Sequence, residues 1–331
     1  MAVETTYFED VLQEALSERD MELQERALPE LNIGEALPIT EGLDFALEYV
    51  DFGVTDVVGS VKDGIIGNKT NSLKTIDSDI EWKKAPVAQW AKAATWTQQE
   101  LEKIAKLNIN LQSKKQDDLY ANAMSTIQYA GYIGHQAVKG QEGLLTGASV
   151  QLITDATNKT IADMTAEEFI SMILDAYNTA WAKSGYRIQP THIAMDASDF
   201  MLAMQKFDTN SVIVGVDLLP VSAMDRIMAA LRKASGNDAF SVTFVKVPSG
   251  YARNIVDTKT RLAIYTYDEA YLEMKVHMPE LLPVRPRDLL TYECGYRSAF
   301  GGAMWKQPQS AVYVDYNNSV VAARTTSKKS S

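Results

Sequence analysis

The chain has 331 residues, of which 46% are hydrophobic and 23% charged, and its formal net charge is −11. This composition is typical of a globular protein with room for two domains, and an acidic chain does not bind nucleic acid through bulk charge. The longest apolar runs fall short of the ~20 residues that a transmembrane helix needs. Cys294 is the only cysteine, so a disulfide within the chain is excluded and we expect a soluble protein from a reducing compartment.

The first thirty residues are strongly acidic. They hold nine acidic and two basic residues, a net charge of −7. Apolar side chains at helical spacing predict an amphipathic helix over residues 4–27, which is marginal by itself. Pro29, Gly34 and Pro38 then interrupt the pattern.

A hairpin is predicted next. Short apolar pieces over residues 45–61 lead into a polar loop, residues 63–72, and a return strand is predicted over residues 76–82. A two-stranded hairpin with so few core residues is unstable alone. Three aromatic residues therefore either face a partner surface or pack on the parent domain, and the sequence leaves both alternatives open. They are Trp82, Trp90 and Trp96.

A long helical run follows. Thr97-Gln98-Gln99-Glu100 is a capping box, in which the threonine hydroxyl and the glutamate carboxylate each bind a backbone amide of the first turn. Asn108 and Asn110 predict an interruption, after which the helix is expected to resume near Ser113 and to continue to Lys139. Small residues on one stripe of this second piece favour close approach of another backbone.

Residues 160–280 predict a mixed α/β domain. A second capping box, Thr165-Ala166-Glu167-Glu168, starts a helix that is expected to end at Gly185. Further elements follow by the same reasoning. They are a strand over 191–195, a helix from 197, a helix over 221–234, and strands over 241–247, 261–267 and 271–278.

Proline residues mark an expected boundary after this domain. They are Pro279, Pro283 and Pro286. Residues 289–315 then predict two or more strands with a bend at Gly301-Gly302. The polar and basic residues 317–331 are expected to form a flexible tail.

No motif in the chain favours catalysis or metal binding. The three histidines, His135, His192 and His277, have no metal-ligand spacing, and solvated or core positions are the better interpretation for them. The segment 64–70 lacks the contiguous Gly-Lys-Thr of a phosphate-binding loop and is interpreted as a hairpin tip. Asp77-Ser78-Asp79 lacks the other ligands of a calcium loop, and Cys294 is expected to be a buried, inert thiol. We therefore predict no catalytic, cofactor-binding or metal-binding residues and no cofactor.

The order of parts, together with short motifs, resembles the major capsid proteins of tailed bacteriophages with the Hong Kong 97-like fold, which have encapsulin-like relatives. The resemblance covers roughly residues 45–316 and depends on two groups of residues. The first is Tyr132-Ile133-Gly134 followed by Gly143-Leu144-Leu145; the second is Arg297, Gly301, Gly302, Pro308 and Tyr313-Val314-Asp315.

This resemblance implies an α+β fold divided into five parts. They are an N-terminal arm (1–48), an extended loop (49–95), a peripheral domain with a long spine helix (96–160 and 281–316), an axial α/β domain (161–280) and the tail (317–331). It also implies a structural protein that is not an enzyme, whose copies form the hexamers and pentamers of an icosahedral shell around double-stranded DNA.

Further expectations follow from the same resemblance. The shell is a virion capsid assembled in the bacterial host cytoplasm, with a portal, possible separate scaffolding or decoration proteins, non-specific contact with packaged DNA and no membrane. Some relatives join a loop lysine to a neighbour's asparagine, and plain solvated lysines are the alternative. The candidates are Lys62, Lys69, Lys74, Lys83 and Lys84, with Asn317 and Asn318. An encapsulin-type nanocompartment and a soluble α/β enzyme remain the alternative functions.

Overall fold

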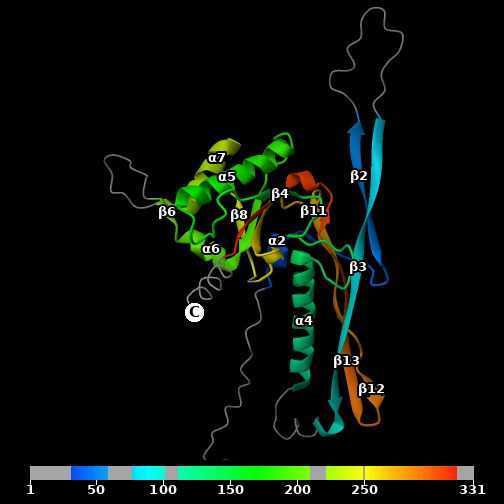
Figure 1. Cartoon of the computed structure of the whole chain (residues 1–331). Coiled ribbons are helices and arrows are strands. Elements are labelled where there is room, and N and C mark those ends of the chain that lie inside the picture. The colour runs from blue at the N-terminus through cyan, green and yellow to red at the C-terminus, as the bar shows by residue number, and fades with distance from the viewer. Residues whose placement is uncertain (1–30, 59–76, 101–110, 209–220, 249, 319–331) are drawn as a thin grey trace, which may run out of the picture. The chain divides into compact units, whose positions relative to one another are not determined.

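The computed structural model describes residues 31–58, 77–100, 111–208, 221–248 and 250–318 (Figure 1). The helix predicted over residues 4–27 and the hairpin tip lie outside the described residues. The helices are α2 (Ile33–Ala36), α4 (Leu111–Ile133), α5 (Ala166–Lys183), α6 (Ala197–Met204) and α7 (Ala223–Ser235), with one 3-10 turn, η1 (Pro308–Ser310).

The first of two large sheets has seven strands in the order β1-β11-β13-β3-β2, with β12 paired to β13 and β14 paired to β11. Its strands are β1 (Ile39–Glu41), β2 (Tyr49–Val58), β3 (Asp77–Thr97), β11 (Leu272–Leu281), β12 (Arg285–Asp288), β13 (Thr291–Gly301) and β14 (Met304–Trp305). The pairing of β1 with β11 is parallel, whereas the pairings of β11 with β13, β13 with β3 and β3 with β2 are antiparallel.

The predicted hairpin is formed by β2 and β3, and its return strand is far longer than the sequence indicated. Residues 77–86 of β3 pair with β2, and residues 87–97 of the same strand pair with β13. The hairpin is therefore continuous with the seven-stranded sheet through one unbroken strand.

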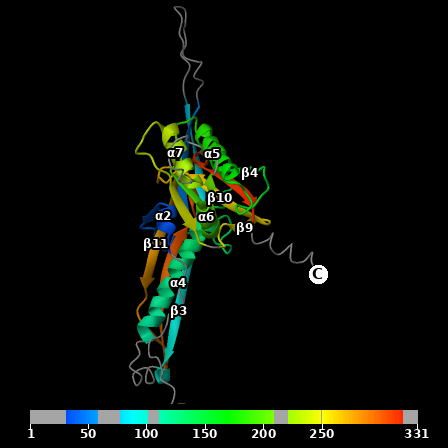
Figure 2. The same cartoon turned by 90° about the vertical axis from the view of Figure 1, so that its left-hand side faces the viewer.

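Helix α4 lies along this sheet and contacts β13, β3 and β11 (Figures 1 and 2). The predicted stripe is its buried face: Ala123, Ile127 and Ala130 are each at most 1% exposed. The helix ends at Ile133 rather than at the expected Lys139. Gly134 adopts a left-handed conformation with φ of +85°, and its amide donates to the carbonyl of Ala130, which closes the last turn.

The second sheet has six strands in the order β4-β15-β10-β5-β8, with β9 paired to β10. Its strands are β4 (Gln151–Thr154), β5 (His192–Asp196), β8 (Thr243–Val247), β9 (Arg253–Val256), β10 (Lys259–Tyr265) and β15 (Val312–Asn317). A separate two-stranded ribbon is made by β6 (Phe207–Asp208) and β7 (Val221–Ser222).

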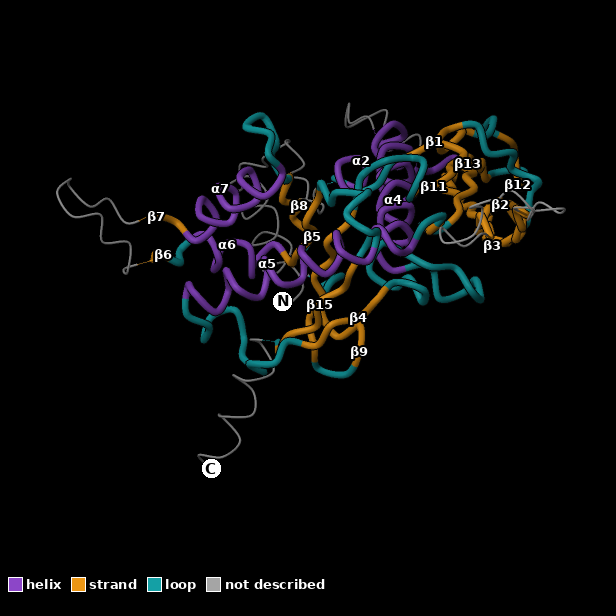
Figure 3. Tube along the Cα trace, turned by 90° about the horizontal axis from the view of Figure 1, so that it is seen from above, coloured by secondary structure: helices purple, strands orange, loops and turns teal. Residues whose placement is uncertain are grey.

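The middle of the six-stranded sheet is buried on both faces, and alternate residues of its central strands enter different cores. On β10, Leu262 and Ile264 pack with the residues of α5, α6 and α7, whereas Ala263 and Tyr265 pack with α2, the end of α4 and β11. Strand side chains alternate between faces, so a shift of one residue would exchange the two cores. This double burial fixes the register of the sheet. Figure 3 shows α6 and α7 on one side of the sheet and α2 and α4 on the other.

The helices over this sheet begin at strong N-caps. Thr165 and Glu168 form the predicted capping box of α5, and Asp196 and Ser222 cap α6 and α7. The helix predicted over 221–234 therefore begins two residues later, because Val221 and Ser222 belong to β7. Gly236, with φ of +65°, ends it.

The sheets do not follow the sequence boundaries expected at residues 160 and 280. Strands β4 and β15 lie outside 161–280 but pair into the six-stranded sheet, whereas β11 lies inside that range but belongs to the seven-stranded sheet. Pro279 lies within β11 and does not end that strand. The register of β11 against β13 shifts between His277 and Glu280, and this bulge accommodates the proline within the strand.

Candidate functional site

A junction between the two sheets gathers the short motifs that the sequence singled out. The loop after α4 folds back on the helix end, where the amides of Leu144 and Leu145 donate to the carbonyls of Gly131 and Tyr132. A side chain on Gly143 could not fit, because its Cβ would lie 2.4 Å from the backbone of Tyr132 and Ile133. The Gly-Leu-Leu sequence thus closes the end of α4.

The Tyr313-Val314-Asp315 motif on β15 also binds the loop that follows α4. The Tyr313 hydroxyl donates to the carbonyl of Leu144 at 2.6 Å and accepts from the amide of Gly147 at 2.9 Å. Arg261 forms two hydrogen bonds with the carboxylate of Asp315, at 2.7 and 2.9 Å, and a third with the carbonyl of Leu145. The Arg261 and Asp315 side chains are 9% and 4% exposed, so this is a desolvated ion pair.

The bend after β13 completes the junction. The amide of Ala303 donates to the carbonyl of Glu142 at 2.7 Å, and a Cβ on Gly302 would lie 2.1 Å from that same oxygen. The Trp305 indole packs edge-on against Tyr313. Gly302 is therefore required by close backbone approach rather than by a turn conformation, whereas a Cβ on Gly301 would meet its nearest atom at 3.6 Å.

The hairpin presents an apolar face to the outside. Directly paired residues of antiparallel strands share a face, which places Tyr49, Ile80 and Trp82 together. They are 56%, 55% and 68% exposed. The opposite face is covered near the hairpin base, where Val50 is buried and Phe52 packs against the body. This outer apolar face is the first candidate interaction surface.

The three tryptophans divide between the two alternatives that the sequence left open. Trp96 is 2% exposed, so it packs on its own chain, whereas Trp82 is the most exposed of the three. Trp90 is half-buried and packs on the core below α4. The position of each tryptophan along β3 decides whether it is exposed or buried. Trp82 pairs with the hairpin strand β2, whereas Trp96 pairs with the central strand β13.

A second exposed apolar patch surrounds the turn between β12 and β13, and sequence reasoning missed it. Its most exposed member is Leu289 at 98%. The other large apolar residues are Leu281, Val284, Leu290 and Tyr292, each at least 40% exposed. Exposed patches of this kind mark interaction surfaces. The signal in the sequence is a run of apolar residues among prolines and arginines, and those prolines by themselves predict only a boundary.

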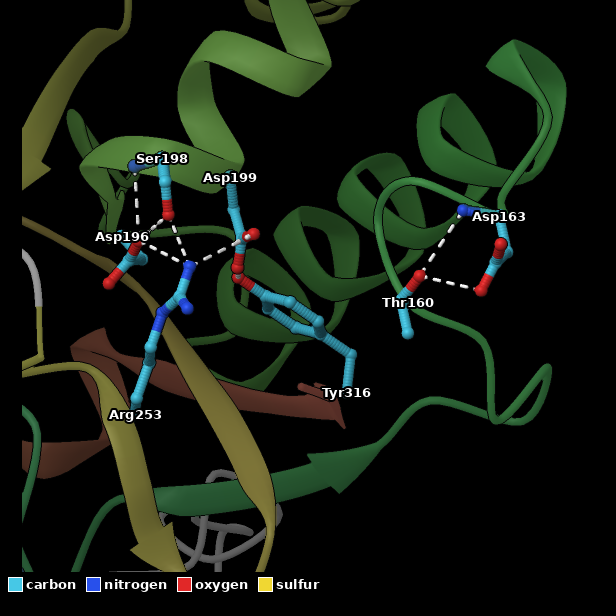
Figure 4. Close-up of polar contacts among 7 residues, drawn as sticks. All are labelled: Thr160, Asp163, Asp196, Ser198, Asp199, Arg253 and Tyr316. Carbon is cyan, nitrogen blue, oxygen red and sulfur yellow. Dashed lines mark hydrogen bonds and ion pairs between the residues drawn. The ribbon is translucent and has the colours of Figure 1, made fainter. Parts of the chain in front are cut away.

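A buried polar cluster lies where α6, β9 and β15 meet (Figure 4). One Asp196 oxygen accepts hydrogen bonds from the Ser198 amide at 3.0 Å and from Arg253 at 3.1 Å, and the Tyr316 hydroxyl donates to Asp199 at 2.8 Å. Burial raises the pKa of Asp199 above its ordinary value. Two carboxylates and one guanidinium thus tie three elements together, and sequence reasoning missed the cluster because its members lie on separate segments.

A separate polar contact drawn in the same view belongs to the turn before α5. The Thr160 hydroxyl donates to the Asp163 carboxylate at 2.7 Å and accepts from the Asp163 amide at 3.2 Å. These bonds stabilise the turn that leads into the capping box.

The three histidines lie apart and have structural surroundings. His192 stacks on Tyr267 with ring centroids 4.8 Å apart, and burial lowers its pKa to about 4. His135 packs edge-on against Tyr129, and the His277 ring hydrogen-bonds to the carbonyl of Leu43. Among the described residues, no group of three or more histidine, cysteine or acidic side chains is arranged to hold a metal ion.

The cysteine, the aspartates and the loop segment that were considered as candidate sites lie apart along the chain. Cys294 is 2% exposed on β13, as predicted. Asp77 and Asp79 lie at the hairpin end of β3, while segment 64–70 lies outside the described residues. No helix of the described residues is long and apolar enough to cross a membrane.

The candidate cross-linking residues do not meet within the described part of one chain. Lys83 and Lys84 lie on β3, and Lys83 forms a 3.8 Å ion pair with Glu81. Asn317 ends β15, where its side chain donates to the carbonyl of Asn158, and Asn318 is buried. Lys62, Lys69 and Lys74 lie outside the described residues. The cross-link between copies therefore stays a prediction.

Comparison with known proteins gives a consistent result. The family described as "Major capsid protein" matches residues 62–316. The fold is similar to the capsid of Myoviridae phage XM1, with 16% identity, a TM-score of 0.73 and coverage of 92% of this chain and 97% of that one. It is also similar to the capsid of an empty GTA particle (10%, 0.59, 96% and 98%) and to Mycobacterium phage Adephagia (9%, 0.59, 93% and 98%). No curated protein matches the sequence.

Proposed function

The chain belongs to the major capsid protein family, has the Hong Kong 97-like fold and is a subunit of a capsid shell, and from this we propose how it assembles. Its copies form the hexamers and pentamers of an icosahedral head that encloses the double-stranded DNA of a tailed bacteriophage. The role is structural, without catalysis. A portal closes one vertex, separate scaffolding or decoration proteins assist, and assembly takes place in the host cytoplasm.

The observation that carries this proposal is the outer face of the β2–β3 hairpin. Within the described chain, its apolar side chains are exposed, and the two strands that bear them pair only with each other over residues 77–86 of β3. A two-stranded hairpin gains little stability by itself, so burial against a second copy would stabilise both the hairpin and the contact. Many identical contacts of this kind add up to a stable shell.

The contribution of the Trp82 side chain to the contact between copies is large enough to measure. Trp82 is 68% exposed. If a neighbouring copy covers that surface, which amounts to about 170 Å², the contact gains about 4 kcal/mol at the usual coefficient for apolar burial. Every subunit of the shell would make this contact once, so its loss is multiplied over the particle.

The experiment compares Trp82→Ala with the conservative Trp82→Phe. We expect Trp82→Ala to fold normally, with a free energy of unfolding within about 0.5 kcal/mol of the original chain, because the side chain is exposed. Particles counted by electron microscopy and sedimentation should be lost or greatly reduced. Trp82→Phe should retain most of them. Normal particle yield from Trp82→Ala would contradict the proposal.

The contents of the particle separate a phage head from an encapsulin-type nanocompartment. A head should contain nuclease-resistant double-stranded DNA, whereas a nanocompartment should contain a co-purifying protein cargo. The family match and the similar capsid structures favour the head. A protein cargo without DNA in particles purified from the native source would contradict it.

A further inference from the structure

A groove lies between helix α5 and strand β4, away from the hairpin. It has a volume of about 480 Å³. One wall is a stripe of α5 at four-residue spacing, made by Glu167, Ser171, Asp175 and Thr179. The opposite wall is residues 154–157, and the floor is apolar, formed by Ile153, Met172, Ala176 and Val314. The groove thus combines an apolar floor with acidic and hydroxyl-bearing rims.

The strand that borders this groove is an open edge of the six-stranded sheet. Among the described strands, β4 has one neighbour, β15, and its other side is unpaired. Leu152 in the middle of β4 is 46% exposed. An open edge of this kind is a template for the addition of another strand, and proteins usually cover or protect it.

We propose that residues 319–331 of the same chain occupy this groove and add to the free edge of β4. Strand β15 runs parallel to β4, with Asp315 paired to Thr154, and it ends at Asn317. The Asn317 side chain donates to the carbonyl of Asn158, and residues 154–157 just before it form a wall of the groove. The segment therefore starts at one end of the groove.

The segment is long enough to turn back along β4. The helical stripe from Glu167 to Thr179 spans about 18 Å at the rise of an α-helix. Residues 319–331, if extended, reach about 43 Å at the rise of a strand. About half of that length remains for the reversal after Asn318.

The chemistry of the segment complements the groove. Residues 320–323 are Val-Val-Ala-Ala, which suit the apolar floor. The only charged residues that follow are basic, Arg324, Lys328 and Lys329, a charge of +3.

The groove carries the matching charge. Four carboxylates line it, those of Asp155, Glu167, Glu168 and Asp175. Lys159 binds Glu168 at 2.6 Å and offsets its charge, and the rim remains negative through Asp155 and Asp175. The basic segment and the acidic rim therefore carry opposite charges. The flexible tail that composition alone predicted becomes a strand that protects an open edge.

The first test measures how fast trypsin cleaves after Arg324, Lys328 and Lys329 in the folded full-length chain, by intact-mass spectrometry. Asp175→Lys reverses one exposed charge of the groove, and Asp118→Lys makes the same change on exposed α4 as the matched control. We expect Asp175→Lys to be cleaved about tenfold faster than the original chain, which corresponds to about 1.4 kcal/mol of docking free energy. Asp118→Lys should match the original chain.

Salt gives an independent measurement on the unchanged protein. Because the Debye length falls from about 8 Å at 0.15 M to about 3 Å at 1 M ionic strength, cleavage of the original chain should accelerate in 1 M NaCl after correction with a free peptide of residues 319–331. Equal cleavage of the original chain and Asp175→Lys, with no effect of salt, would overturn the proposal even if every variant folds normally.

Carbodiimide cross-linking identifies the occupant. The reagent joins a lysine amine to a nearby carboxylate as an amide, and we expect links from Lys328 or Lys329 to Asp155, Glu167 or Asp175. In particles grown from a mixture of isotopically heavy and light chains, these links should join heavy to heavy and light to light. Mixed links would assign the groove to a neighbouring copy, and links to other carboxylates or none would exclude docking here. Both results would overturn the proposal.

Discussion

Removing the carboxylate of Asp315 tests the junction between the two sheets most directly. In the folded chain this carboxylate receives two hydrogen bonds from Arg261, and neither side chain is more than 9% exposed. Asp315→Ala leaves the guanidinium desolvated and without its anion. Breaking a buried pair from one side costs about 3–5 kcal/mol, so we expect that decrease in the free energy of unfolding.

A double-mutant cycle separates the unpaired charge from the loss of contacts. In Arg261→Met with Asp315→Leu, both charges are gone and the apolar volume is roughly kept. The double variant still loses stability at one place, because the carbonyl of Leu145 no longer receives its hydrogen bond from Arg261. An unsatisfied buried acceptor costs about 1–3 kcal/mol, so the double variant should be more stable than Asp315→Ala.

The assay is urea unfolding of the unassembled subunit, followed by tryptophan fluorescence, for the original chain, Asp315→Ala, and the cycle of Arg261→Met, Asp315→Leu and the double variant. The informative quantity is the coupling energy rather than any single midpoint. If Asp315→Ala costs less than about 1 kcal/mol, or if the two single effects simply add, the pair is solvated and the reasoning is wrong.

Two further predictions concern close packing and pH. Gly302→Ala should lower the free energy of unfolding by about 1–3 kcal/mol, because its Cβ would meet the Glu142 carbonyl, whereas Gly34→Ala, with no atom within 4 Å, should be neutral or slightly stabilising. Equal midpoints in urea would contradict this. His192 has a pKa of about 4 when folded and about 6.5 when unfolded, so the unfolded chain binds more protons between those values. Stability should fall by about 1–2 kcal/mol from pH 7 to pH 4, after allowance for solvent screening, and His192→Phe should reduce that fall.

Local patterns in the sequence predicted most elements, because their signals are local. The capping box at Thr97 forms as expected, with Thr97 and Glu100 each bonding the other's backbone amide. The box at Thr165 and the strand–helix sequence that follows it are likewise present. The end of α4 was missed because helical spacing continues past Gly134, and only its left-handed conformation shows that the chain turns there.

Sheet membership could not be predicted from periodicity. Strand β11 buries the apolar residues Leu272, Met274 and Val276 at alternate positions, although Glu273 between them is buried as well. Alternation does not identify the neighbouring strand. The junction is a partial exception. Its motifs could be located by resemblance, while the contact of Tyr313 with Leu144, which explains them, required the structure. The Asp196–Arg253 cluster carried no sequence signal, since its members come from separate segments.

A single strand that serves two sheet partners leads to one more prediction. Residues 77–86 of β3 pair only with β2 in a hairpin whose outer face is exposed, whereas residues 87–97 pair with the central strand β13 and contact α4. Local opening costs little where few apolar contacts must break.

In the unassembled subunit, amide hydrogen exchange should therefore be fast over 77–86 and slow over 87–97, with the change near Pro86. Assembly should slow exchange over 77–86 by at least about tenfold, because the proposed contact of Trp82 with a neighbouring copy, worth about 4 kcal/mol, must then break before the hairpin opens. Uniform protection along β3 before assembly, or no added protection after it, would show that the hairpin is stabilised by its own chain and not by a neighbouring copy.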